Sequence, residues 1–174
     1  MPMPSQRLFW ALWPQDNVRQ QLQSIQQNAL FKGFKVVRPD NLHLTLVFLG
    51  QVNDEQRAFI IDNANRVRVP EFSVILERLS YWRKPGIICL TPQSHESVHQ
   101  QLVEQLNRGA DDCGIVTEKR PYRPHVTLAR YAKHAIRLEP PPLYWHVDFF
   151  VLCQSVSTDT GVRYRVLQQW GLTG

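Results

Sequence analysis

Two copies of one short pattern, His-x-Thr-Leu, contain the residues of this sequence that are best suited to chemistry. The copies occupy residues 43–46 (HLTL) and 125–128 (HVTL). With 6 histidines among 174 residues, a single His-x-Thr match carries little weight, because random placement gives about a quarter of one match. Two copies, each with the same following leucine and each four residues after a proline, indicate a repeated functional element.

Two imidazoles and two hydroxyls form a set that can bind and cleave a phosphoester. The unperturbed pKa of histidine is near 6.5, so one ring can be protonated and donate while the other is neutral and accepts. In-line displacement at phosphorus needs both states, because one group activates the entering water and the other protonates the departing oxygen. Thr45 and Thr127 would bind nonbridging phosphate oxygens, and the scheme requires no metal ion and no cofactor.

Both motifs have the alternation of a strand with one buried face. In residues 41–50 (NLHLTLVFLG), leucine or phenylalanine occupies alternate positions up to Phe48, while His43 and Thr45 take the opposite parity. Residues 124–130 (PHVTLAR) repeat this arrangement with His125 and Thr127. Since side chains alternate between the two faces of a strand, each histidine shares a face with its threonine, and Phe48 is expected in the core.

The remaining periodicities predict strands and amphipathic helices in alternation. Strands are expected at 7–13, 34–38, 72–82, 87–90, 145–156 and 162–167, and helices at 15–30, from 53 to before Pro70, and at 95–111. The order strand, helix, proline, histidine motif occurs twice, which indicates an internal duplication. We therefore expect one domain, residues 1–174, with an α+β fold of two pseudo-symmetric lobes. Mainly antiparallel sheets and flanking helices would surround a central cleft, with one histidine strand in each lobe.

Composition gives weaker guidance. The net charge of +5 and the isoelectric point near 9.4 favour an anionic partner only mildly. Three widely spaced cysteines without a CxxC pair suggest small core residues in a reducing compartment. The apolar run near the amino terminus is too short for a signal sequence or a membrane span, so we expect a cytoplasmic protein without membrane contact. We also expect a monomer.

With these motifs, the chain resembles the two-histidine (2H) phosphoesterases, and most closely the bacterial RNA 2',3'-cyclic phosphodiesterases, also called 2'-5' RNA ligases. The likeness extends from RLFWALWP to YRVLQQW. It implies hydrolysis of RNA 2',3'-cyclic phosphate ends, tRNA fragments among them, to 2'-phosphomonoesters, with 2',5' ligation as a side activity. It also implies that His43 is the proton donor and His125 the proton acceptor; spacing alone leaves these two roles interchangeable.

Four further residues are candidate RNA contacts. Arg123 has the parity of His125, and Tyr122 and Phe48 could stack on bases, although core packing is the simpler prediction for Phe48. The family resemblance favours a basic phosphate ligand at Arg130. In an unbroken strand, however, Arg130 would point to the opposite face from His125, so that role requires a bulge or the end of the strand.

Other interpretations stay open at this level. Zinc binding by His43 and His125 lacks a third ligand at suitable spacing, and His95 and His99 are typical of a polar helix face. A 2H enzyme could act on another small cyclic phosphoester, such as a cyclic nucleotide or an ADP-ribose cyclic phosphate. A noncatalytic protein that binds RNA ends is the alternative from a different functional class.

Overall fold

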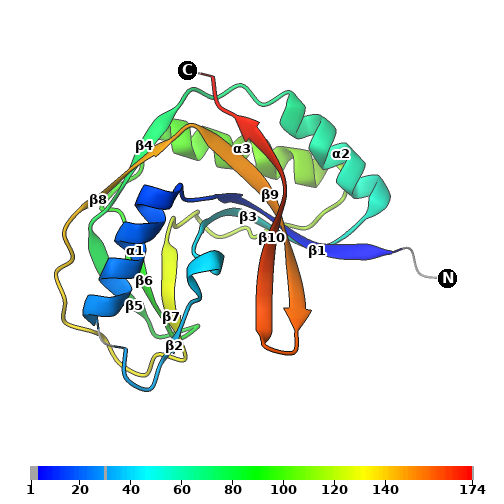
Figure 1. Cartoon of the computed structure of the whole chain (residues 1–174). Helices are drawn as coiled ribbons and strands as arrows, with labels where there is room; N and C mark the ends of the chain where they lie inside the picture. Colours follow the sequence, from blue (N-terminus) through cyan, green and yellow to red (C-terminus); the bar gives the residue numbers. More distant parts are fainter. Residues whose placement is uncertain (1–3, 30, 174) are drawn as a thin grey trace.

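Antiparallel strand pairing organises the chain, whose computed structural model describes residues 4–29 and 31–173. The strands are β1 (Ser5–Leu12), β2 (Lys35–Val36), β3 (Leu44–Asn53), β4 (Phe72–Leu76), β5 (Arg78–Trp82), β6 (Ile87–Thr91), β7 (Val126–Arg130), β8 (Leu143–Val147), β9 (Phe149–Thr158) and β10 (Gly161–Gly171). The helices are α1 (Asp16–Ala29), α2 (Asp54–Asn65) and α3 (Ser97–Asp112), with a short 3-10 helix, η1 (Pro39–Asn41). One sheet has the order β10-β9-β1-β3-β7-β6-β5 with β2 on β7, and β4 and β8 form a second. The α+β class with mainly antiparallel sheets is confirmed (Figure 1).

The two motif strands, β3 and β7, are neighbours at the centre of the large sheet. They pair at one position, Leu44 opposite Val126. Because paired residues point to the same face of a sheet, the residues on either side of this pair all turn to the other face. His43, Thr45, His125 and Thr127 therefore share one face, called the histidine face below. The motif strands lie side by side in one sheet, whereas the sequence suggested that they face each other across a cleft.

Each motif strand contains an extra residue directly after its threonine. In β3, Ala11 pairs with Thr45 and Trp10 with Val47, which leaves Leu46 unpaired. In β7, Cys89 pairs with Thr127 and Ile88 with Ala129, which leaves Leu128 unpaired. An extra residue of this kind, a β-bulge, reverses the alternation beyond it. Phe48 and Arg130, each three residues after its threonine, consequently turn to the histidine face.

Two segments predicted as single strands are in fact two strands each. Residues 72–82 divide at Glu77 into β4 and β5, and residues 145–156 divide at Asp148 into β8 and β9. In both cases one part belongs to the small sheet and the other to the large sheet. Neither break has a glycine or proline, so no local signal indicated that the chain changes sheets.

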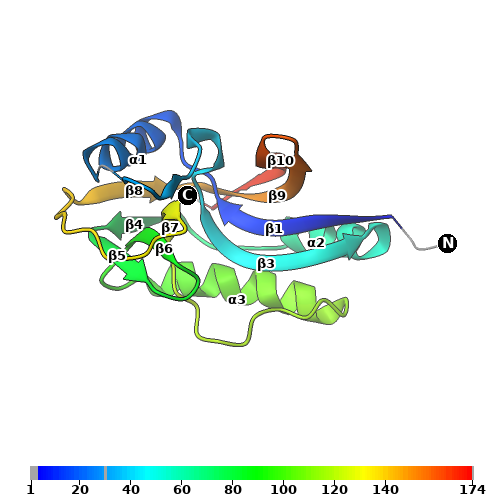
Figure 2. The same cartoon turned by 90° about the horizontal axis from the view of Figure 1, so that it is seen from below.

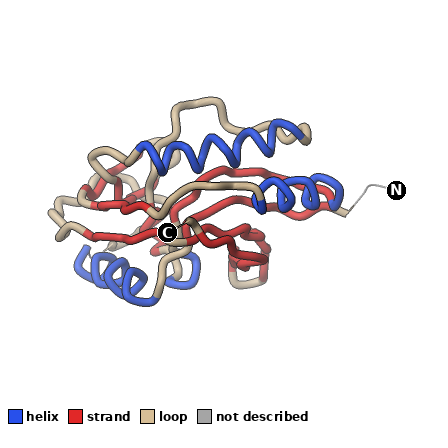
Figure 3. Tube along the Cα trace, turned by 90° about the horizontal axis from the view of Figure 1, so that it is seen from above, coloured by secondary structure: helices blue, strands red, loops and turns tan. Residues whose placement is uncertain are grey.

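The helices enclose the strands from outside. Figure 2 shows α1 and α3 separated by the strands, and Figure 3 shows the same arrangement from above. Helix α1 buries Val18, Leu22, Ile25 and Ala29, as the spacing predicts, and the predicted last residue, Leu30, lies outside the described residues. Helix α2 begins with a capping box between Asn53 and Gln56. None of the described helices is long and apolar enough to cross a membrane.

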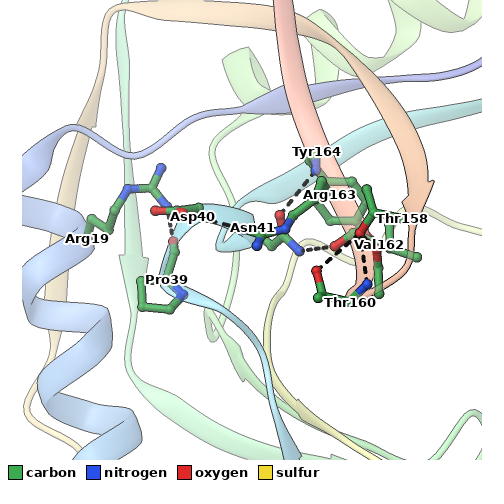
Figure 4. Close-up of polar contacts among 10 residues, drawn as sticks. Arg19, Pro39, Asp40, Asn41, Thr158, Thr160, Val162, Arg163 and Tyr164 are labelled. Atoms are coloured by element: carbon green, nitrogen blue, oxygen red, sulfur yellow. Dashed lines mark hydrogen bonds and ion pairs between the residues drawn. The ribbon is translucent and has the colours of Figure 1, made fainter.

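The side chain of Asn41, in η1 just before the first motif, forms hydrogen bonds with the hairpin of β9 and β10. The Asn41 Nδ2 donates to the carbonyl of Val162 at 2.9 Å, and its Oδ1 accepts from the backbone N–H of Tyr164 at 3.1 Å (Figure 4). The side-chain amide thus replaces a missing strand at the free edge of β10. Asn41 is 8% exposed, and both of these hydrogen bonds are partly buried.

Asn41→Ala should destabilise the protein and loosen this hairpin. Loss of two partly buried hydrogen bonds should cost about 1–3 kcal/mol of unfolding free energy, measured by urea denaturation. Hydrogen exchange at the Tyr164 amide should accelerate as well. Asn28→Ala, at an exposed position of α1, serves as the control and should change neither quantity. An unchanged exchange rate at Tyr164 would contradict the role assigned to Asn41.

Candidate active site

His43 directly precedes β3 and has both ring nitrogens engaged. Its Nδ1 lies 2.7 Å from the carbonyl oxygen of Asn41, and its Nε2 lies 3.0 Å from the Thr45 hydroxyl. Because a carbonyl only accepts, Nδ1 carries the proton, and in the neutral ring Nε2 accepts from the threonine. The nitrogen that can gain or lose a proton is therefore Nε2.

His125 repeats the arrangement on the other motif. Its Nδ1 lies 2.9 Å from the carbonyl oxygen of Arg123, which is again two residues earlier in the chain. The same argument leaves Nε2 as the nitrogen that exchanges protons. Both motifs thus hold the ring by the same backbone bond and present the same atom.

Aromatic side chains surround both histidines. The rings of Phe9 and Tyr164 have centroids 5.0 Å from that of His43, and the ring of Trp13 stacks at 6.0 Å. The centroid of Trp82 lies 4.5 Å from that of His125. Neither Trp13 nor Trp82 was among the candidate site residues in the sequence. Because residues 8–13 are apolar at both parities, no pattern there marked the face that belongs to the site.

These surroundings lower the pKa of both histidines. Burial is the main cause for His43, with smaller contributions from the charges of Arg130, His125 and Arg19, and its pKa falls to about 4. Burial also lowers the pKa of His125, followed by the charges of Arg123 and Arg130. Both rings are therefore neutral near pH 7 in the protein without substrate. Since Arg130 influences both, the two histidines and this arginine lie in one electrostatic neighbourhood.

The reversed alternation after each threonine corrects two expectations about side-chain direction. Phe48 was predicted to point into the core, but it is 46% exposed, because the bulge at Leu46 turns it to the histidine face. Arg130 would have pointed away in an unbroken strand, and the bulge at Leu128 brings it back. The guanidinium of Arg7 lies over the Phe48 ring, 4.9 Å from its centroid.

Arg123 is exposed. Its guanidinium lies over the ring of Trp82, 4.1 Å from the centroid, and Trp82 in turn contacts His125. A cation over an aromatic face is held electrostatically, and its outer side remains exposed to solvent. Arg123, Trp82 and His125 are thus in successive contact beside the second motif, with the Trp82 and His125 rings tilted by 54°.

Tyr122 and His99 contact each other. Tyr122 was a candidate for base stacking, but its hydroxyl is buried and donates to the Thr45 carbonyl at 3.0 Å. Its partly buried ring makes T-shaped contacts with His95 and His99, and the stacking of Tyr122 on a base stays a prediction. His99 is 0% exposed, and His95 precedes α3, so the predicted polar helix face of these histidines is wrong.

The remaining candidate ligands do not gather around a metal position. Among residues 4–29 and 31–173, no group of three His, Cys, Asp or Glu side chains is arranged to hold a metal ion. Cys89 and Cys153 are buried, as predicted, and burial raises the pKa of each thiol to about 12. Neither thiol is therefore a ready nucleophile.

Comparison with known proteins agrees with this geometry. The family model described as LigT like Phosphoesterase matches residues 12–89. The RNA 2',3'-cyclic phosphodiesterase of Escherichia coli (strain K12) is 34% identical over 97% of both chains. That of Thermus thermophilus is 31% identical over 97% of this chain and 91% of its own. The crystal structure of E. coli LigT complexed with 3'-AMP superposes with a TM-score of 0.92, at 31% identity, and covers 98% of this chain and 100% of that one. The resemblance predicted from the motifs is confirmed, and the chain belongs to the LigT-like phosphoesterase family.

Proposed function

We propose that this protein hydrolyses the 2',3'-cyclic phosphodiester at the end of an RNA to a 2'-phosphomonoester, by acid–base catalysis between His43 and His125. The observation that carries the proposal is the pair of imidazoles on one sheet face, each with Nδ1 fixed by a backbone carbonyl so that Nε2 is the reactive atom. Family membership supports the same reaction, because the relatives compared above are named RNA 2',3'-cyclic phosphodiesterases.

The displacement assigns one proton to each histidine. His125 Nε2 accepts a proton from water as the water oxygen bonds to phosphorus, and the bond from phosphorus to O3' breaks. His43 Nε2 donates its proton to O3', which leaves a 3'-hydroxyl and a 2'-phosphate. The direction follows the family resemblance, since the geometry of the two histidines is equivalent. A 5'-hydroxyl in place of water would give a 2',5' linkage by the same displacement.

The negative charge of the substrate would favour the protonated form of His43, which that ring needs to act as an acid. Without substrate, burial and the nearby positive charge of Arg130 keep His43 neutral, since they lower its pKa. A phosphodiester brings one negative charge between these groups, and an opposite charge within a few ångströms favours the protonated imidazole. Substrate binding should therefore be accompanied by uptake of a proton. Thr45, Thr127 and Arg130 would hold the nonbridging oxygens.

Two exposed stacks of an arginine on an aromatic ring support contact with RNA rather than with phosphate alone. Arg7 with Phe48 lies along β3, and Arg123 with Trp82 lies beside His125. Nucleobases stack on aromatic rings and on guanidinium planes. Together with the net charge of +5, these two pairs favour an RNA end over a small cyclic nucleotide as the substrate.

The matched bulges also support the predicted domain organisation. We infer a single domain formed by duplication, because β1 with β3 and β6 with β7 have the same register around the motif threonines. We further propose that the protein is a monomer, that it is cytoplasmic, and that its substrates include tRNA fragments. The three cysteines are free, with Cys89 and Cys153 buried and Cys113 partly exposed, which agrees with a reducing compartment.

The first test is product identity in the presence of EDTA. Incubation with RNA ending in a 2',3'-cyclic phosphate should give a 2'-phosphate, identified by chromatography against both monophosphate standards.

His43→Ala and His125→Ala should each lose about 10²- to 10⁴-fold in rate, whereas Thr45→Val and Thr127→Val should lose about tenfold. His134→Ala, at an exposed position, should be fully active. A 3'-phosphate product, or full activity in either histidine variant, would refute the mechanism. Tight binding of cyclic-phosphate ends without turnover, unchanged in the histidine variants, would indicate the RNA-end binder.

The lowered pKa values predict an acidic optimum. The ratio kcat/KM reports ionisation of the free protein, and it should be highest while one of the two coupled histidines is protonated. Because burial and positive charge lower both pKa values below the ordinary 6.5, the kcat/KM profile should be bell-shaped with its maximum below about pH 6.5 and should decline as the pH rises.

Arg130→Gln should move this maximum to higher pH. The change removes a positive charge that lowers both pKa values, so both histidines should titrate at higher pH by NMR of the imidazole nitrogens. Arg137→Gln removes an exposed arginine that contributes to neither histidine and should leave the maximum in place. A maximum that stays in place, or moves to lower pH, in Arg130→Gln would contradict this electrostatic assignment.

Phe48→Ala tests whether a base of the RNA stacks on the Phe48 ring. Loss of one stacked base should cost about 1–3 kcal/mol, so KM for a short RNA with a cyclic phosphate end should rise about tenfold or more while kcat changes little. Phe59→Ala removes a ring of similar exposure, 44% against 46%, from α2 and should not change KM. Equal KM values for Phe48→Ala and the unchanged protein would exclude this contact.

A further inference from the structure

A short chain of hydrogen bonds links α3 to the first motif by way of the residues before the second. His99, on α3, has its Nε2 3.0 Å from the hydroxyl of Tyr122, and that hydroxyl lies 3.0 Å from the carbonyl oxygen of Thr45. Tyr122 is three residues before His125. The chain therefore connects both histidine motifs without involving either catalytic ring.

The direction of every proton in this chain follows from its acceptor. The Thr45 carbonyl can only accept, so the single hydroxyl proton of Tyr122 points to it. The Tyr122 oxygen must then accept from Nε2–H of His99, which makes His99 a neutral ring with an unprotonated Nδ1. Within the described residues, that Nδ1 is buried and has no hydrogen-bond partner. Burial lowers the pKa of His99 to about 3 and raises that of Tyr122, so this arrangement persists across the working pH range.

Thr45 is the point at which the two motif strands separate. They pair only at Leu44 and Val126, and the bulge at Leu46 follows Thr45 directly. No further β3–β7 pair in the described residues fixes the Thr45 backbone relative to the second motif. The Tyr122 hydroxyl makes that connection, and the Thr45 side chain is in turn the partner of His43 Nε2.

His99 is itself firmly held, which gives the connection a rigid end. Its ring is 0% exposed and stacks on Phe72 of β4, with centroids 5.0 Å apart and an interplanar angle of 25°. The bond to Tyr122 is the one hydrogen bond that the His99 side chain makes within the described residues. Without it, Nε2 would also be a buried nitrogen without a partner, which would cost stability.

We propose that Tyr122, oriented by His99, is a positioning residue that fixes the Thr45 backbone and thereby the place of the Thr45 hydroxyl beside His43. Its buried hydroxyl touches no substrate, so it acts through Thr45. The inference rests on the proposed function, in which the Thr45 hydroxyl binds the phosphate and contacts the acid. Removal of the hydroxyl should reduce the rate of the chemical step more than substrate affinity.

A double-mutant cycle tests this with RNA carrying a 2',3'-cyclic phosphate end. Tyr122→Phe removes only the hydroxyl and should lower kcat about fivefold, the range expected for one hydrogen bond, with KM nearly unchanged. In a Thr45→Val background, the same change should lower kcat less than about twofold, because the Thr45 hydroxyl, which Tyr122 positions through the backbone, is already absent. The shape of the pH profile should stay the same, since the chain does not titrate.

Variants of His99 test the same positioning role independently. His99→Leu should reproduce the loss seen in Tyr122→Phe, and His99→Gln, whose amide can still donate to the Tyr122 oxygen, should restore most of kcat. Tyr144→Phe removes a hydroxyl from an exposed tyrosine of β8, 68% exposed, and should have full activity. Melting temperatures of all variants identify any general loss of stability.

The outcomes separate this inference from the proposed function. Equal losses of kcat from Tyr122→Phe in both backgrounds would show a general structural role and overturn positioning through Thr45, as would full kcat in Tyr122→Phe. Wild-type kcat in Thr45→Val alone would overturn the role of Thr45 and this inference with it, while His43→Ala and His125→Ala still test the acid–base mechanism separately.

Discussion

One backbone pairing, Leu44 opposite Val126, sets the geometry on which the histidine site is built. Strands alternate their side chains, so a single register position directs both histidines and both threonines to one face. A shift by one residue in either strand would turn one motif into the core. Because this is the one position at which β3 and β7 pair within the described residues, the strands are free to separate beyond it. On the side away from β1, the carbonyl of Thr45 then bonds to the Tyr122 side chain instead of to β7.

The two bulges give the repeated motifs different chemistry at equivalent positions. Each turns the third residue after the threonine to the histidine face, which is Phe48 in one motif and Arg130 in the other. An exposed ring in one motif and, in the other, a cation that lowers the pKa of both histidines break the symmetry of an arrangement that is otherwise matched. The aromatic position suits a base, and the guanidinium suits a phosphate oxygen. The repeat thus supplies equivalent backbones, and the side chains supply the distinction between them.

Burial and positive charge act together on the two imidazoles, and both oppose protonation. The same Arg130 that can bind a phosphate also lowers the pKa of each histidine. In the proposed mechanism, an anionic substrate would reverse this balance when it binds, because its charge would compensate that of the arginine. The charge state proposed for catalysis therefore belongs to the complex and not to the free protein. Fixed Nδ1 bonds ensure that the exchanged proton resides on Nε2 in either state.

The α+β class, most of the strands and helices, the shared face of each His–Thr pair and the family could all be predicted from the sequence, because they follow from local periodicity and from motifs a few residues long. The bulges at Leu46 and Leu128, the sheet changes at Glu77 and Asp148, and the aromatic surroundings of the histidines emerged only with the folded chain. Neither the bulges nor the sheet changes have a glycine or proline that marks them locally. A bulge is set by register with the neighbouring strand, and the burial of His99 and Tyr122 by which elements pack over them, so both are properties of contacts between distant segments rather than of the segments themselves.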